Sequence, residues 1–128
     1  MKNNFILFFA MLVFAIEIST AQQVITLNSA DAKKMLDAKT KVVLLDVRPA
    51  TEVAQGHLAN SINIDIYRYD AYLKIDKLDK KATYLVYCRS KNSSSMAVVY
   101  MSEHGFKHIY HLTDGFVGWS ESNFPIVK

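Results

Sequence analysis

The chain has 128 residues, of which 51% are hydrophobic, and its formal net charge is +3. This charge is too small to indicate a nucleic-acid partner, and no basic run is interleaved with aromatic residues. The sequence contains a single cysteine, which excludes an internal disulfide and leaves one thiol that is either reactive or buried.

The amino terminus has the layout of a secretory signal peptide. A short basic start is followed by an unbroken apolar run over residues 5–16 and by small residues at Ser19 and Ala21. A membrane anchor is the alternative, but Glu17 ends the run well short of the roughly 20 apolar residues that span a bilayer. We therefore predict a signal peptide over residues 1–21, cleavage near Ala21, no stable membrane anchor, and export to a periplasm or to the secreted fraction.

Residues 22–128 are long enough for one domain, in which apolar strands alternate with helices. In chain order, the predicted elements are strand 24–27, helix 30–39, strand 42–47, helix 49–54, strand 61–64, helix 67–78, strand 84–87, helix 94–104, strand 108–112 and helix 115–122. This alternation predicts an α/β fold with a five-stranded, mainly parallel sheet and helices on both faces.

Cys88 lies where an apolar strand stops and a polar loop begins. The N–H groups of such a loop and the positive end of the helix that follows form an anion site, which favours the thiolate. Ligands of parallel sheets gather at the carboxyl ends of strands, where Asp46 also lies. A buried, inert thiol is the alternative. With Cys88 as the candidate nucleophile, the candidate substrate-binding residues are Arg89, Ser90, Lys91, Asn92, Ser93 and Ser94.

Three separated motifs between residues 24 and 128 resemble those of rhodanese-like sulfurtransferases. They are Leu45-Asp46-Val47-Arg48 with Glu52, Gly56-His57 and Ser61-Ile62-Asn63-Ile64; the loop Tyr87 to Ser94; and Leu112-Thr113-Asp114-Gly115 with Trp119 and Phe124-Pro125. The resemblance implies the three-layer rhodanese-like fold. It also implies a single-domain sulfurtransferase that needs no metal or organic cofactor.

In that family the loop cysteine takes the outer sulfur of a small donor and holds it as a persulfide. The resemblance therefore implies thiosulfate, a polysulfide or a persulfide as the donor, and a thiol or cyanide as the acceptor. Arg89 and Lys91 would add positive charge for an anionic donor.

The loop departs from the family pattern at Lys91, where glycine is most usual. Glycine would permit a positive φ, so a lysine is expected to carry a steric cost there, or to add a cation that selects the donor. A non-catalytic rhodanese-like module that binds a partner or senses oxidants therefore stays open as a second function. Asp114 also replaces a customary glycine, near a helix start where an acid is favourable.

Ser94 argues against a cysteine phosphatase. Those enzymes need an arginine six positions after the nucleophile to bind phosphate through two hydrogen bonds, and residue 94 is a serine.

A second polar group precedes the loop, and we predict a supporting, structural role for its residues. Asp46 is expected to bond loop N–H groups, Arg48 to pair with Glu52, and His57 to fix the turn after Gly56. The alternative makes Arg48 a substrate clamp and His57 a base.

The sequence predicts no metal site. Of the three histidines that are close in sequence, His104 is separated from His108 by a helix-ending glycine, and His108 and His111 point to opposite sides of a strand. Tyr67, Tyr69 and Tyr72 are expected to pack at, or line, the mouth of the site, and Trp119 to lie in the core.

Overall fold

The computed structural model describes residue 16 and residues 23–128. The predicted signal peptide therefore lies outside the described residues, apart from Ile16. No helix in the part that the structure describes is long and apolar enough to cross a membrane.

Residues 23–128 contain one sheet in which each pair of neighbouring strands is parallel, in the order β1-β5-β4-β2-β3. The strands are β1 Val24–Leu27, β2 Val43–Asp46, β3 Ile62–Asn63, β4 Thr83–Tyr87 and β5 His108–Leu112. The helices are α1 Ser29–Asp37, α2 Ala50–Val53, α3 Ala71–Asp76, α4 Asn92–Glu103 and α5 Gly115–Glu121. The predicted five-stranded α/β fold is confirmed.

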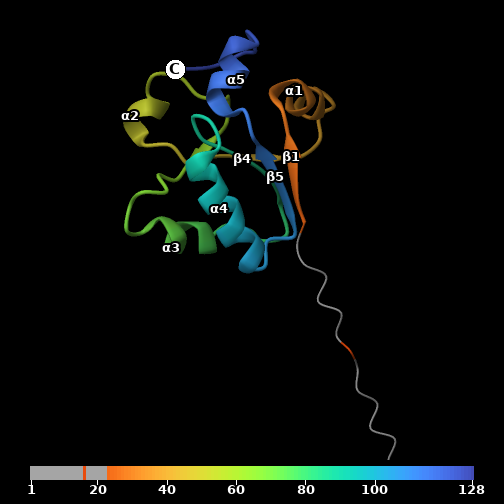
Figure 1. Cartoon of the computed structure of the whole chain (residues 1–128), viewed down its shortest axis with the longest axis vertical. Helices are drawn as coiled ribbons and strands as arrows, with labels where there is room; N and C mark the ends of the chain where they lie inside the picture. The colour runs from red at the N-terminus through yellow and green to blue at the C-terminus, as the bar shows by residue number, and fades with distance from the viewer. Residues whose placement is uncertain (1–15, 17–22) are drawn as a thin grey trace, which may run out of the picture.

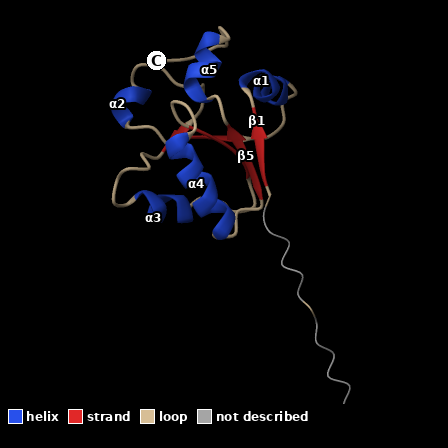
Figure 2. Ribbon diagram, in the orientation of Figure 1, coloured by secondary structure: helices blue, strands red, loops and turns tan. Residues whose placement is uncertain are grey.

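Helices cover both faces of the sheet (Figures 1 and 2), and an apolar core lies on each face. Helices α1 and α5 cover one face, where Ala32 and Trp119 belong to the same buried cluster. Helices α3 and α4 cover the other face, where Ile75 and Met101 are fully buried. This three-layer arrangement matches the prediction and places Trp119 in the core, as expected.

The alternation of side chains along β4 decides which face carries the thiol. Leu85 and Tyr87 join the cluster under α1 and α5, whereas Tyr84 and Val86 join the one under α3 and α4. Cys88 continues the second series and packs on the α4 side. The alternation of side chains along the strand thus places the thiol on the face of the sheet that the first turn of α4 covers.

Helix α3 is shorter than predicted, since it begins at Ala71 and not at Tyr67. The Asp65 carboxylate accepts a hydrogen bond from the N–H of Tyr67, and the Asp65 carbonyl accepts one from the N–H of Arg68. These local bonds hold a turn in place of a helical start. Tyr69 is left 91% exposed, so it does not pack as expected.

Asp114 lies directly before α5, near a helix start as predicted, and its side chain serves a second helix. Its side chain makes no cap on α5, and instead accepts hydrogen bonds from Ser29 N at 3.0 Å and Ser29 Oγ at 2.9 Å. The acid therefore lies at the positive end of α1, where a negative charge is favourable. It joins two helices that are 85 residues apart in sequence.

Candidate active site

The carboxyl ends of β2 and β4 lie side by side, with Asp46 paired in register with Tyr87. A pocket of about 230 Å³ opens over this edge. It is lined by Arg48, Pro49, Glu52, Tyr67, Cys88, Arg89, Ser90, Asn92 and Ser93. The sheet edge where the sequence places the nucleophile is therefore hollowed, and most of the residues that line the hollow are polar or charged.

Cys88 lies at the inner wall of this pocket and is only 2% exposed. Its thiol donates a hydrogen bond to Ser94 Oγ over 3.1 Å. Cys88 is thus almost fully buried, yet it lines the pocket, and its thiol is held by Ser94.

The loop after Cys88 is held by the start of α5. The N–H of Phe116 donates to the Cys88 carbonyl at 2.9 Å, and the N–H of Val117 donates to the Arg89 carbonyl at 3.0 Å. Gly115 has a φ of +60°, and a Cβ on it would lie less than 3.0 Å from the carbonyl oxygens of Arg89 and Ser90. The loop carbonyls therefore face α5, which only a glycine at this position allows.

Helix α4 begins two residues earlier than predicted, at Asn92. Its first backbone bond runs from Ser95 N to the Lys91 carbonyl at 2.9 Å. The N–H groups of Asn92, Ser93 and Ser94 therefore precede the helical ladder, and they are available to an anion.

The steric cost expected at Lys91 is absent. Lys91 has a φ of −143° as the residue that precedes α4, so the backbone does not need the positive φ that glycine would supply. The prediction is wrong because the chain enters the helix with a negative φ at Lys91, which a residue other than glycine can adopt.

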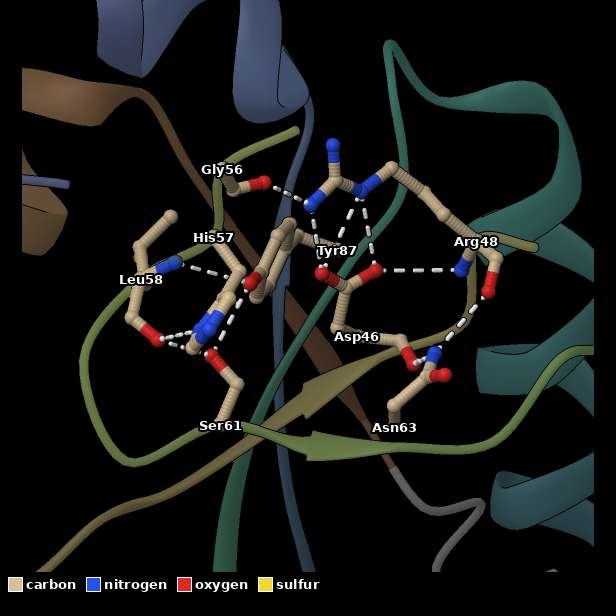
Figure 3. A network of polar contacts seen from close by, with 8 residues as sticks. All are labelled: Asp46, Arg48, Gly56, His57, Leu58, Ser61, Asn63 and Tyr87. Carbon is tan, nitrogen blue, oxygen red and sulfur yellow. Dashed lines mark hydrogen bonds and ion pairs between the residues drawn. The ribbon is translucent and has the colours of Figure 1, made fainter. Parts of the chain in front are cut away.

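Asp46 and Arg48 form a buried pair at the end of β2 (Figure 3). Arg48 Nη2 lies 2.7 Å from Asp46 Oδ2 and 2.8 Å from the Gly56 carbonyl oxygen, and Arg48 Nε lies 3.0 Å from Asp46 Oδ1. The predicted pair between Arg48 and Glu52 is therefore wrong. Asp46 also accepts the backbone N–H of Arg48, at 3.0 Å.

The guanidinium of Arg48 lies 4.1 Å from the centre of the Phe116 ring. Burial acts to lower the pKa of Arg48, but the hydrogen bonds and charge of Asp46 outweigh it and raise the pKa. Arg48 thus stays a cation in the pocket wall, fixed by its neighbours.

Polar side chains extend this network to the next loop (Figure 3). Tyr87 Oη accepts the N–H of Leu58 at 3.1 Å and lies 2.9 Å from Ser61 Oγ, and burial raises the pKa of this tyrosine. Asn63 Nδ2 donates to the carbonyls of Asp46 and Arg48, both at 2.9 Å. These contacts fix the wall of the pocket that carries Arg48.

His57 has the structural position expected for it. Its backbone pairs with Val127 in an antiparallel bridge, and its Nδ1 lies 2.9 Å from the Leu58 carbonyl oxygen. It is absent from the residues that line the Cys88 pocket.

The structure divides the candidate loop residues into two groups. Arg89, Ser90, Asn92 and Ser93 line the pocket with Cys88, as Glu52 and Arg48 do. Lys91 is exposed and Ser94 is fully buried, and neither lines this pocket. Tyr67 lines it, as expected of a residue at the mouth.

The structure also brings His111 to the site, a residue that the sequence pattern does not predict to lie there. His111 is 5% exposed, and its Nε2 lies 2.6 Å from Ser94 Oγ. Burial and the charge of Lys91 both lower the pKa of His111, so the neutral imidazole is favoured. The sequence feature that could have located His111 is the two-residue period of a strand, because His111 lies two residues after the buried Ile109 and so points to the same face of the sheet.

No group of three or more His, Cys, Asp or Glu side chains in the described part of the chain is placed to hold a metal ion. His104 stacks on Tyr100, with ring centres 3.7 Å apart, and His108 is exposed.

Comparison with known proteins identifies the family. The model of the rhodanese-like domain matches residues 28–122. The chain belongs to the rhodanese-like domain family. Among curated relatives, it is 25% identical over 101 residues to a sulfurtransferase of Allochromatium vinosum, covering 79% of this chain and 92% of the relative. It is 33% identical over 81 residues to the thiosulfate sulfurtransferase GlpE of Coxiella burnetii, covering 63% and 74%.

A solved structure supports the fold. A rhodanese-related protein from Thermoplasma volcanium superposes with a TM-score of 0.68 and 32% identity, over 80% of this chain and 97% of that one. The α/β fold expected from the sequence motifs is therefore that of the rhodanese-like family.

Proposed function

We propose that the protein is a sulfurtransferase that carries sulfane sulfur as a persulfide on Cys88. The observation that carries this proposal is the position of the thiol, which borders a small polar pocket at the first turn of α4. The curated relatives named as sulfurtransferases support the same class of reaction.

The cycle has two displacements at sulfur. The Cys88 thiolate attacks the outer sulfur of thiosulfate, the S–S bond of the donor breaks, and sulfite leaves with the electron pair. An acceptor thiolate or cyanide then attacks the outer sulfur of the persulfide, and the Cys88 thiolate is regenerated. In each displacement the attacking group brings one electron pair and the leaving group takes one away. The cycle therefore needs no cofactor that supplies or accepts electrons.

The pocket favours a small, anionic donor. Its volume of about 230 Å³ is below the roughly 300–1,000 Å³ usual for sites that hold drug-sized ligands. Its lining includes two cations, Arg48 and Arg89, against one carboxylate, Glu52, and the N–H groups of Asn92 and Ser93 lie at the start of α4. The terminal sulfur anion of a persulfide would be stabilised by the same N–H groups.

The test is intact-mass spectrometry after treatment with thiosulfate, polysulfide or glutathione persulfide. Because Cys88 is the single cysteine, one added sulfur reports on that thiol alone. The added mass should disappear on addition of cyanide or a thiol, and Cys88→Ser should take up no sulfur. If Cys88→Ser takes up as much sulfur as the wild type, the proposal is wrong. A folded wild type that takes sulfur from none of the donors would instead support the non-catalytic binding or redox-sensing module.

We also propose that the protein is exported and that residues 1–21 are its signal peptide. The support is the sequence pattern of a basic start, an apolar run and small residues near Ala21. Expression of the whole chain in a bacterial host, with fractionation of the cells, should yield a mature protein that begins near Gln22. A product that keeps residues 1–21 contradicts cleavage.

A further inference from the structure

A chain of polar contacts links Cys88 to Ser94 and His111, two buried residues that do not line the pocket. Cys88 Sγ lies 3.1 Å from Ser94 Oγ, and Ser94 Oγ lies 2.6 Å from His111 Nε2. The three residues come from the end of β4, from α4 and from β5, and each is 5% exposed or less. The sulfur-transfer cycle proposed above uses neither Ser94 nor His111.

The direction of the hydrogen bonds follows from what each group can donate. The thiol donates to Ser94 Oγ, so the single hydrogen of the Ser94 hydroxyl is left for either His111 Nε2 at 2.6 Å or the Lys91 carbonyl at 3.2 Å. The contact with His111 is the shorter by 0.6 Å. A neutral imidazole that accepts at Nε2 then completes a donor chain running from sulfur to nitrogen.

We propose that His111 receives the proton of Cys88 through Ser94 and so generates the thiolate nucleophile. In this step the S–H bond breaks as the thiol proton passes to Ser94 Oγ. The hydroxyl proton of Ser94 passes to His111 Nε2, and the serine is unchanged at the end. The products are a thiolate and an imidazolium, with the same number of protons as before. The inference rests on the proposed function in that the thiolate is taken as the attacking group.

The surroundings of His111 keep its imidazole neutral before the transfer, so that Nε2 can accept a hydrogen bond. The charge of Lys91, from the loop before α4, acts on His111, and Cys88, at the end of β4, is linked to it through Ser94. Strand β1 places Thr26 in register beside His111, and α4 contributes Ser94, neither of which titrates. Burial and Lys91 lower the pKa of His111, which keeps Nε2 free of a proton before the transfer.

The burial of the two product charges is offset because they form together, separated only by the Ser94 hydroxyl. Ser94 can then donate back to the thiolate, as a charge-assisted hydrogen bond. His111 does not line the pocket and so acts as a positioning residue for the proton, while the donor approaches the sulfur from the pocket.

The experiment is a titration of the thiolate by its ultraviolet absorbance, with no sulfur donor present and with Cys88→Ala as the baseline. Failure of the proton transfer is thereby distinguished from failure of sulfur transfer. In His111→Gln the midpoint should rise by about one pH unit, which lowers the thiolate fraction near neutral pH about tenfold. Ser94→Ala should also raise the midpoint of the thiolate titration. The variant with both substitutions should show the same rise as whichever single variant has the larger one. His108→Gln, which changes an exposed histidine of the same strand, should leave the midpoint unchanged.

A midpoint that stays at the wild-type value in folded His111→Gln overturns the proposal, even if Ser94→Ala raises it, because a direct hydrogen bond from Ser94 would explain that result. If His111→Gln does not fold, nuclear magnetic resonance of the His111 imidazole decides. Its nitrogen shifts should follow the Cys88 titration in the wild type and lose that dependence in Ser94→Ala. Nitrogen shifts that ignore the state of Cys88 overturn the proposal.

Discussion

The ends of β2 and β4 are neighbours in the sheet, yet their polar groups are arranged in opposite ways. At the end of β2, Asp46 and Arg48, together with Asn63 of the neighbouring β3, direct their hydrogen bonds to other protein groups (Figure 3). At the end of β4, the N–H groups at the start of α4 precede the helical ladder and border a pocket. The hydrogen bonds at the end of β2 are thus satisfied within the protein and form a fixed wall of the pocket, the closed side. The N–H groups at the start of α4 form the open side, which is free to bind a ligand.

The largest expected effect comes from breaking the closed side. Asp46→Ala leaves the guanidinium of Arg48 buried without its counter-charge, so the free energy of unfolding should fall by about 3–5 kcal/mol. Asp37→Ala breaks the surface pair of Lys33 and Asp37 and should leave stability close to the wild type. Urea denaturation followed by circular dichroism measures both, and equal losses would contradict a wall held by its buried charges.

The second effect tests the contact between α5 and the open side. Gly115→Ala should lower the free energy of unfolding by about 1–3 kcal/mol beyond the cost of its left-handed backbone, because the methyl meets the carbonyls of the nucleophile loop. Gly105→Ala is the matched control. Its φ is also positive, at +87°, but its Cβ would meet only Lys80 Cδ, at 3.7 Å. Sulfur uptake should fall in Gly115→Ala alone, and equal behaviour of the two variants would count against the contact.

A third, smaller effect separates the two cations of the loop. Arg89 lines the pocket and Lys91 does not, so Arg89→Gln should raise the KM for thiosulfate by about fivefold, as the loss of an exposed charge contact of about 1 kcal/mol would give. Lys91→Gln should raise it less. Steady-state assays at low salt measure the difference, and a larger effect at Lys91 would show that the donor binds outside the pocket.

The smallest effect is a pH dependence of stability at His111. Because burial and Lys91 lower the pKa of His111 in the folded protein from 6.5, the unfolded chain binds more protons below about pH 6.5. Stability should therefore fall as the pH drops through and below this value, and His111→Gln should lose part of that fall. Denaturation midpoints from pH 7.5 down to pH 5 would show it, and identical slopes in the two proteins would contradict it.

The sequence was sufficient for features that depend on local pattern. The period of apolar residues along β4 and the polar stretch after Cys88 predict the strand, the loop and the helix, and the motifs predict the sheet. The start of α3 was missed because two hydrogen bonds to Asp65 outweigh the helical spacing of the tyrosines.

The features that were missed at the site depend on contacts between distant segments. The partner of Arg48 is Asp46 and not Glu52, because the guanidinium folds back over its own strand end towards the Gly56 carbonyl. The approach of His111 to Ser94 needs β4 and β5 to pair in register, which a single sequence does not reveal. The φ of Lys91 is likewise set by the way the chain enters α4.

The hydrogen bonds from the start of α5 to the loop after Cys88 have a consequence for folding while the chain is being synthesised. Cys88 leaves the ribosome before the residues whose N–H groups bind its carbonyl and that of Arg89, at Phe116 and Val117. Because chains emerge from the amino terminus onwards, a nascent chain that ends near residue 110 carries the thiol on a loop that has not yet been shaped. The loop that carries the nucleophile therefore gains its full set of contacts only after α5 has been made.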